Sequence, residues 1–154
     1  MERIDLLKKF LPLLRFYPPY WFTGIKVEGW VEKYTAIRVS MRLRLHNRNL
    51  FGAHFGGSLY AMCDPFYVLI VAANLGTDYV ILDQAATIRF RRPGRGKVSA
   101  VFSIAPQTLE NIKQEVHEKG RKSYVLQTEI TDEGGKVVAQ VEKTIYIRLK
   151  NTVI

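Results

Sequence analysis

The stretch NLFGAHFGG, residues Asn49–Gly57, decides how this chain folds, because its last two glycines lead directly into a long apolar segment. Residues 58–75 contain one charged side chain, Asp64. A helix that is apolar nearly all round is a buried helix, and a carboxylate on it costs several kcal/mol unless it is paired or used. The sequence therefore predicts a buried helix that carries one paired or functional carboxylate.

The length and composition predict a single domain. The chain has 154 residues, and we expect one domain over 1–154, with 1–22 as a helical extension packed on it through aromatic side chains. The apolar run 65–75 is too short to span a bilayer, and the N-terminus lacks the pattern of a secretory signal. The single cysteine excludes an intrachain disulfide. We expect a cytoplasmic protein with no membrane partner.

The chain is basic, with 23 Lys and Arg against 14 Asp and Glu and a net charge of +9, which favours a polyanionic partner. Two clusters without acids carry much of this charge: Arg38, Arg42, Arg44 and Arg48, and then Arg89, Arg91, Arg92, Arg95 and Lys97. Each cluster is either a solvated strand face or a site for ligand phosphates or an acidic carrier protein. Nucleic acid is not favoured, because zinc-finger spacing and an aromatic-rich RNA-binding signature are both absent.

Hydrophobic periodicity predicts the order of elements. In chain order we expect a helix over 2–16 that ends at Pro18 and Pro19, strands over 24–31 and 34–45, a helix over 58–74, and strands over 79–91, 97–106, 121–132 and 136–149. The polar gap 107–120 is expected to hold a short helical turn. The last four strands are predicted to form an antiparallel meander whose apolar face the buried helix covers. The fold class is α+β.

This arrangement and the glycine-rich turn resemble the hotdog-fold acyl-CoA thioesterase superfamily, and within it the phenylacetyl-CoA thioesterase type. The signature Asn-x-x-Gly-x-x-His-Gly-Gly, followed by an Asp on the central helix, is matched by Asn49, Gly52, Gly56, Gly57 and Asp64. The resemblance extends over residues 24–149. It implies a curved antiparallel sheet wrapped around one long central helix.

The sequence departs from this signature in three places. Phe55 stands where the family has histidine, with His54 one position earlier. Pro65 directly follows Asp64, and Asp83 stands where relatives often carry a Ser or Thr hydroxyl.

The resemblance implies hydrolysis of an acyl-CoA thioester without a metal or organic cofactor, coenzyme A being part of the substrate. It also implies a homodimer or a dimer of dimers, in which each site takes the glycine turn from one subunit and the carboxylate from the other. The competing hypothesis is a non-catalytic hotdog module that binds acyl-CoA or fatty acyl groups. A dehydratase is not favoured, because Leu69 stands where an Asp-x4-His pair would need histidine.

The catalytic candidates are Asp64, Gly56 and Asn49. Asp64 is expected to be the general base for water or the nucleophile that forms an anhydride; alternatively it caps a helix that starts at Pro65. The Gly56 N–H is the expected oxyanion donor, because a helix N-terminus offers unpaired N–H groups; the glycines could also simply permit a tight turn. Asn49 orients the water or the thioester, or forms the turn.

The substrate-binding candidates are Gly57, His54, Phe55, Asp83, Arg91, Arg92, Arg95 and Lys97. The four cations among them are expected to hold the phosphates of coenzyme A. Asp83 either forms a carboxylate pair with Asp64, in which one pKa is raised, or makes a salt bridge to an arginine. His54 either replaces the family histidine or lies on the surface. Cys63 is expected to be a buried residue and not a nucleophile.

Overall fold

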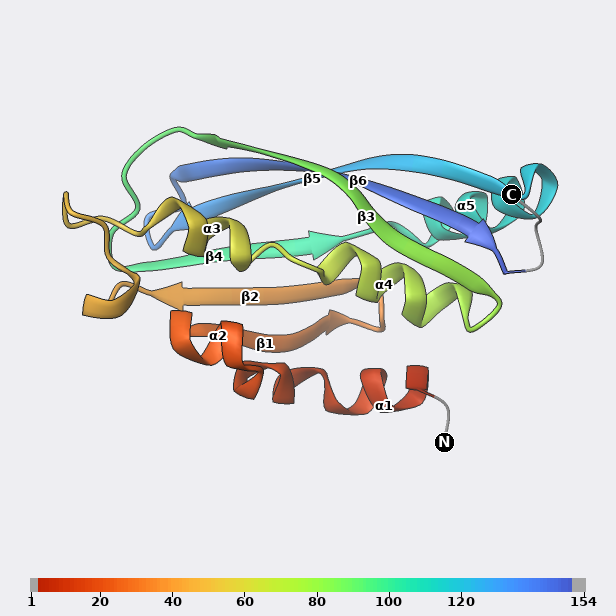
Figure 1. Ribbon diagram of the computed structural model, residues 1–154, viewed down its shortest axis with the longest axis horizontal. Coiled ribbons are helices and arrows are strands. Elements are labelled where there is room, and N and C mark those ends of the chain that lie inside the picture. The colour runs from red at the N-terminus through yellow and green to blue at the C-terminus, as the bar shows by residue number, and fades with distance from the viewer. Residues whose placement is uncertain (1–2, 151–154) are drawn as a thin grey trace.

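A six-stranded antiparallel sheet curves around a central helical segment in the computed structural model, which describes residues 3–150 (Figure 1). The elements are α1 (Arg3–Phe10), η1 (Leu11–Phe16), α2 (Pro18–Thr23), β1 (Ile25–Glu32), β2 (Ala36–Arg42), η2 (Leu45–Asn47), α3 (Gly56–Ala61), α4 (Phe66–Leu75), β3 (Tyr79–Phe90), β4 (Lys97–Ser103), α5 (Pro106–Lys119), β5 (Arg121–Asp132) and β6 (Val137–Leu149). The predicted α+β class is confirmed. Residues 1–2 and 151–154 of the predicted domain lie outside the described residues.

The strand order is β1-β2-β4-β5-β6-β3, so the prediction of a simple meander after the helix is wrong. β3 does not pair with β4; it lies at the far edge and pairs with β6, from Tyr79 opposite Leu149 to Phe90 opposite Ala139. β4 instead pairs with β2 along its whole length. A short connection keeps two strand ends close together, but it does not require the two strands to be neighbours.

The predicted buried helix is confirmed, and it runs from Gly56 to Leu75 in two segments, α3 and α4. Phe66 and Tyr67 of α4 are buried, and their rings lie 5.1 and 5.3 Å from the ring of Phe102 on β4. By length and composition this stretch could cross a membrane, but 56% of it is buried inside the domain. It therefore has the position of a core helix.

The N-terminal segment differs from the single helix predicted over 2–16. It forms α1 and η1, and the two prolines then begin α2 as well as ending the preceding turn, because proline needs no N–H partner at the start of a helix. The predicted aromatic packing is confirmed for Tyr20, which is buried. It is wrong for Phe16, Tyr17, Trp21 and Phe22, which are 53–70% exposed. A six-residue helix turns only one face to the body, and Tyr20 lies on that face.

The polar gap 107–120 forms most of a 14-residue helix, α5, and not a short turn. Its buried residues Leu109, Ile112 and Val116 recur at helical spacing, and this periodicity identifies the helix. β4 and β5 pair at only three positions. Beyond them the Thr128 hydroxyl donates a hydrogen bond to the Val101 carbonyl at 2.8 Å, which joins the separating strands.

Candidate functional site

Asp83 lies on the helix side of the sheet, in regular alternation with Ile81 and just before a shift in strand register. Asp83 is opposite Ile145, and the register changes before Ala85, so that Ala86 is opposite Lys143. Ile145 and Lys143 are both buried on the inner face of β6. Residues that are directly opposite each other on paired strands point to the same face of the sheet. Asp83 therefore shares the inner face with Lys143.

Lys143 connects two carboxylates from distant parts of the chain. Its Nζ lies 3.1 Å from Asp64 Oδ1 and 3.2 Å from Asp83 Oδ1. It also donates a hydrogen bond to the Tyr60 hydroxyl at 3.2 Å and lies 5.2 Å from the centre of that ring. The Lys143 side chain is 1% exposed, whereas those of Asp64 and Asp83 are 49% and 25% exposed. We call these four residues the carboxylate cluster.

The two carboxyl groups have pKa values displaced in opposite directions. Burial raises the pKa of Asp64, but hydrogen bonds from Asp83 and Lys143 outweigh it and leave the pKa below its usual range. Burial and the hydrogen bond with Asp64 raise the pKa of Asp83 to about 6, although the charge and hydrogen bond of Lys143 lower it. Burial lowers the pKa of Lys143, but its carboxylate partners more than compensate, so the ammonium stays charged.

Of the two hypotheses for Asp83, the structure therefore supports the pair with Asp64; the cation beside it is a lysine and not an arginine. The contribution of Lys143 and Tyr60 was not predicted from the sequence. A signal for Lys143 exists, because Val141, Ile145 and Ile147 alternate along β6 and place position 143 on the buried face. A lysine on such a face is rarely buried without a partner.

Asp64 does not cap the helix that follows it, so that alternative is wrong. α4 begins at Phe66 with Pro65 as its N-cap, and the Asp64 side chain bonds to Lys143 instead. The Tyr20 hydroxyl donates a hydrogen bond to the Asp64 carbonyl. Cys63 is fully buried, as predicted, and burial raises its pKa to about 12, which makes it a poor nucleophile.

A separate basic pocket of about 510 Å³ gathers six of the predicted site residues, a volume that suits a small-molecule site. It is lined by Asn49, Phe51, Ala53, His54, Gly56, Leu59, Phe90, Arg91, Arg92, Pro93, Gly94 and Arg95. The predicted residues Gly57, Phe55 and Lys97 are not among its lining residues. Lys97 pairs with Glu28 at 3.2 Å instead.

The two glycines at the start of α3 make room for aromatic rings. A Cβ at Gly56 would lie 2.9 Å from Phe90 Cζ, and a Cβ at Gly57 would lie 2.5 Å from Phe55 Cε1. Larger residues here would force both rings to move. The glycines thus have a packing role whether or not their N–H groups bind substrate.

Asn49 and His54 both support the turn before α3. The Asn49 side-chain carbonyl accepts hydrogen bonds from the N–H groups of Phe51 and Ala53, at 2.9 and 3.1 Å, which is the turn-forming alternative. His54 is 3% exposed, so the expectation of a surface histidine is wrong. Its Nε2 lies 3.1 Å from the Gly96 carbonyl, and burial lowers its pKa. Within residues 3–150 its Nδ1 has no hydrogen-bond partner.

Gly56 and Asp64 belong to different parts of the site. Gly56 begins α3 and lines the basic pocket, whereas Asp64 follows the end of α3 and lies in the carboxylate cluster. Asp64 is not among the lining residues of that pocket. The catalytic role of Asn49, Gly56 and Asp64 stays a prediction.

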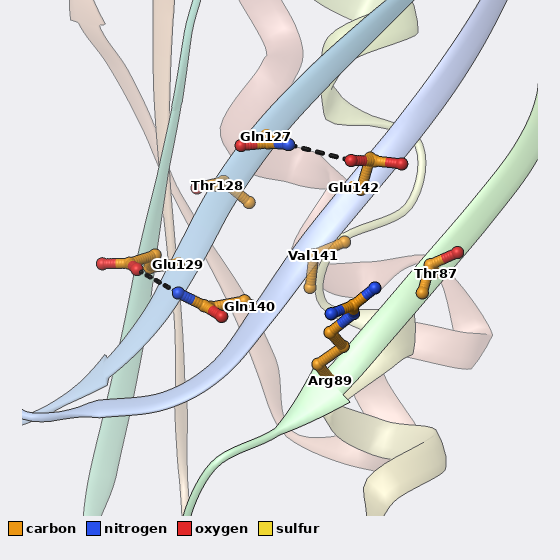
Figure 2. Close-up of a pocket in the computed structure, with 8 residues that line it drawn as sticks. All are labelled: Thr87, Arg89, Gln127, Thr128, Glu129, Gln140, Val141 and Glu142. Carbon is orange, nitrogen blue, oxygen red and sulfur yellow. Dashed lines mark hydrogen bonds between the residues drawn. The ribbon is translucent and has the colours of Figure 1, made fainter.

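A second hollow of about 500 Å³ lies over β3, β5 and β6, on the face of the sheet turned away from the helices (Figure 2). Its polar side chains bond to one another, as Gln127 does to Glu142 and Gln140 does to Glu129. It contains none of the predicted site residues. Across the part of the chain that the structure describes, no three His, Cys, Asp or Glu side chains are grouped as metal ligands.

Comparisons with known proteins agree with this architecture. The family described as "Domain of unknown function (DUF4442)" matches residues 8–147. A protein of unknown function from Pseudomonas aeruginosa, described as a "Probable Thioesterase", is 20% identical, with 96% of this chain and 97% of that chain covered and a TM-score of 0.79. A thioesterase from Haemophilus influenzae is 17% identical, with coverage of 94% and 92% and a TM-score of 0.69.

A third solved structure, a protein of unknown function from Chlorobaculum tepidum, is 17% identical, with 95% and 96% coverage and a TM-score of 0.76. No curated protein matches the chain. At these identities the likeness shows the fold, and it confirms the hotdog fold predicted from the sequence.

Replacing Lys143 by methionine should destabilise the protein by about 2 kcal/mol at pH 7, because two carboxylates lose their shared cation. The loss should be smaller at pH 5, where Asp83 can take up a proton. Lys122→Met is the matched control, since its ion pair with Glu115 is accessible to solvent and such pairs contribute little to stability. Chemical denaturation measures both. Equal losses in the two variants would contradict the bridging role.

Proposed function

The chain belongs to the DUF4442 family, and we propose that it hydrolyses the thioester bond of an acyl-coenzyme A. Two of the solved structures that share its fold are described as thioesterases, one of them as a probable one. The observation that carries the proposal is the Asp64 carboxylate, which Lys143 keeps ionised while half of its side chain faces solvent. An ionised and accessible carboxylate next to the core is a suitable base or nucleophile.

The proposed reaction uses a water molecule, Asp64 and a backbone N–H. Asp64 takes a proton from the water that attacks the thioester carbonyl, or attacks it directly. The N–H of Gly56 begins a helix and would stabilise the negative charge on the carbonyl oxygen. The proposal calls for no metal or organic cofactor.

The proposal includes a homodimer, in which Gly56 of one chain approaches Asp64 of the other. Supporting this, β3 is the last strand of the sheet, and its outer side has no neighbour among the strands that the structure describes. Its residues Leu82 and Phe90 are 54% and 55% exposed. An exposed edge strand of this length is a template for pairing with another chain.

The basic pocket would hold the phosphates of coenzyme A. Arg91, Arg92 and Arg95 line it together with the exposed ring of Phe51, and guanidinium groups bind phosphate oxygens in pairs. The pocket lies beside Gly56, so a bound coenzyme A would direct its thioester toward the start of α3.

A non-catalytic module that binds acyl-CoA is the second candidate. The rings of Phe90 and Phe55 favour it, because they lie against Gly56 and Gly57 at the proposed oxyanion site. Such a module would use the basic pocket without turnover.

Asp64→Asn should lower kcat/KM for acyl-CoA hydrolysis by about 100-fold or more, the scale of a lost general base. The measurement is thiol release from a panel of aliphatic and aromatic acyl-CoA esters. Asp78→Asn is the matched control, because Asp78 is an exposed acid just before β3. If no ester is hydrolysed faster than in buffer, the enzyme proposal is wrong; if Asp64→Asn keeps full activity, the assignment of the base is wrong.

Coenzyme A binding should weaken several-fold when Arg91 and Arg92 are both replaced by alanine, and when salt is raised from 50 to 500 mM. Arg121→Ala, at the opposite end of the sheet, should leave binding unchanged. Isothermal titration calorimetry measures the affinity. If neither salt nor the double variant alters the affinity for coenzyme A, these arginines form a solvated surface and do not bind its phosphates.

Analytical ultracentrifugation at micromolar concentration should give the mass of two or four chains. Leu82→Lys, on the outer part of β3, should shift the protein toward monomer because it replaces an exposed apolar side chain of the pairing edge with a charged one. A monomer for the unmodified chain would contradict the composite site.

A further inference from the structure

We propose that Lys143 joins Asp64 and Asp83 into one proton-sharing unit, in which Asp64 takes the proton of the attacking water and Asp83 stores it until the thiolate leaves. This inference rests on the proposed thioester hydrolysis and deepens it. It gives a chemical role to Asp83 and makes Lys143 the bridge between the two carboxyl groups.

The net charge of the carboxylate cluster favours the uptake of one proton. Two carboxylates and one ammonium group within 3.2 Å of each carboxylate carry one negative charge in total, and a single added proton makes the group neutral. The other ionisable groups that face it are Tyr60 from α3, Tyr20 from α2 and Cys63. Burial raises the pKa values of Tyr20 and Cys63, so these two stay neutral. The cluster is therefore built to accept one proton.

The two acids of the carboxylate cluster differ in exposure and in pKa. The Asp64 side chain is 49% exposed and Asp83 only 25%, so Asp64 is the one that a water or substrate reaches more easily. Burial and its hydrogen bond with Asp64 raise the pKa of Asp83 to about 6, while the pKa of Asp64 stays below its usual range. A proton that arrives at Asp64 is therefore held more strongly by Asp83.

Several contacts hold the Lys143 side chain in place between the two acids. Lys143 is 1% exposed and is fixed by the Tyr60 hydroxyl and ring as well as by the two acids. The backbone of Asp64 is held as well, because the Tyr20 hydroxyl donates a hydrogen bond to the Asp64 backbone carbonyl. Lys143 is thus a positioning residue that keeps both carboxyl groups within reach of one shared proton.

The step balances in atoms and charge. The water oxygen bonds to the carbonyl carbon, and the water's proton passes to Asp64 and on to Asp83. The carbon–sulfur bond then breaks, and the thiolate leaves with the bonding electrons and takes the stored proton back through Asp64. The products are a carboxylic acid and a thiol, and the unit returns to its starting charge.

The test compares the pH dependence of kcat/KM in the unmodified protein, Asp83→Asn and the control Asp78→Asn. In the unmodified protein kcat/KM should decrease at pH values below about 6, because Asp83 is then already protonated and cannot accept another proton. Asp83→Asn should lower the maximum about tenfold or more. It should also move the acid limb at least one pH unit lower, because Asp64 alone then governs it. A variant with the unmodified rate and profile would overturn the inference.

A second measurement does not depend on activity. The pKa of Asp83 is raised by folding, so its stabilising effect is fully present below its unfolded pKa of about 4 and is lost as pH rises through about 6. The Tm of the unmodified protein, minus that of Asp83→Asn, should therefore increase as pH falls from 7 to 4. The depressed pKa of Asp64 acts only at still lower pH. Asp83→Ser provides the same comparison if Asp83→Asn does not fold.

The outcomes separate the two proposals. Hydrolysis with a Tm difference that is independent of pH would overturn the shared proton and leave the thioesterase proposal standing. No hydrolysis of any acyl-CoA, together with a Tm difference that grows toward pH 4, would overturn the thioesterase proposal and support a proton-binding cluster.

Discussion

The ammonium group of Lys143 is the interaction on which the arrangement of the site depends. A buried cation costs several kcal/mol unless carboxylates compensate it, and here Asp64 does so from the break in the central helix and Asp83 from β3. This requirement fixes the positions of β6, of the edge strand β3 and of the break in the central helix relative to one another. Each carboxylate is where it is because the cation on β6 needs it there.

The break in the central helix serves the same arrangement. Asp64 lies between α3 and α4, so its backbone carbonyl is free to accept the hydrogen bond from Tyr20. The N-terminal segment thereby contacts the same residue that Lys143 contacts from the sheet. This explains why α2 packs through Tyr20 while its other aromatic side chains stay exposed. The extension is part of the support for the site.

The sequence allowed local features to be predicted well and long-range ones poorly. The buried helix, its lone carboxylate and the alternating strands follow from periodicity, which neighbouring residues determine. The pairing of β3 with β6 could not be derived, because it depends on contacts between segments about 60 residues apart. Lys143 was visible as a charge on an apolar strand face, but its partners come from α3, β3 and the helix break. Only the folded chain brings them together.

The two edge strands of the sheet, β1 and β3, differ in which segments lie along them. The N-terminal segment lies along β1, where the Trp30 ring N–H donates a hydrogen bond to the Lys8 carbonyl (Figure 1). β3 is the edge that has no neighbouring strand among the residues that the structure describes. A chain with one open edge can add one copy through it, and the pair then has no edge left to extend. Strand pairing would stop at an open twelve-stranded sheet, because both of its outer edges would be β1 strands covered by an N-terminal segment. It would not continue into a fibre, and any larger assembly would have to use the faces of the molecule.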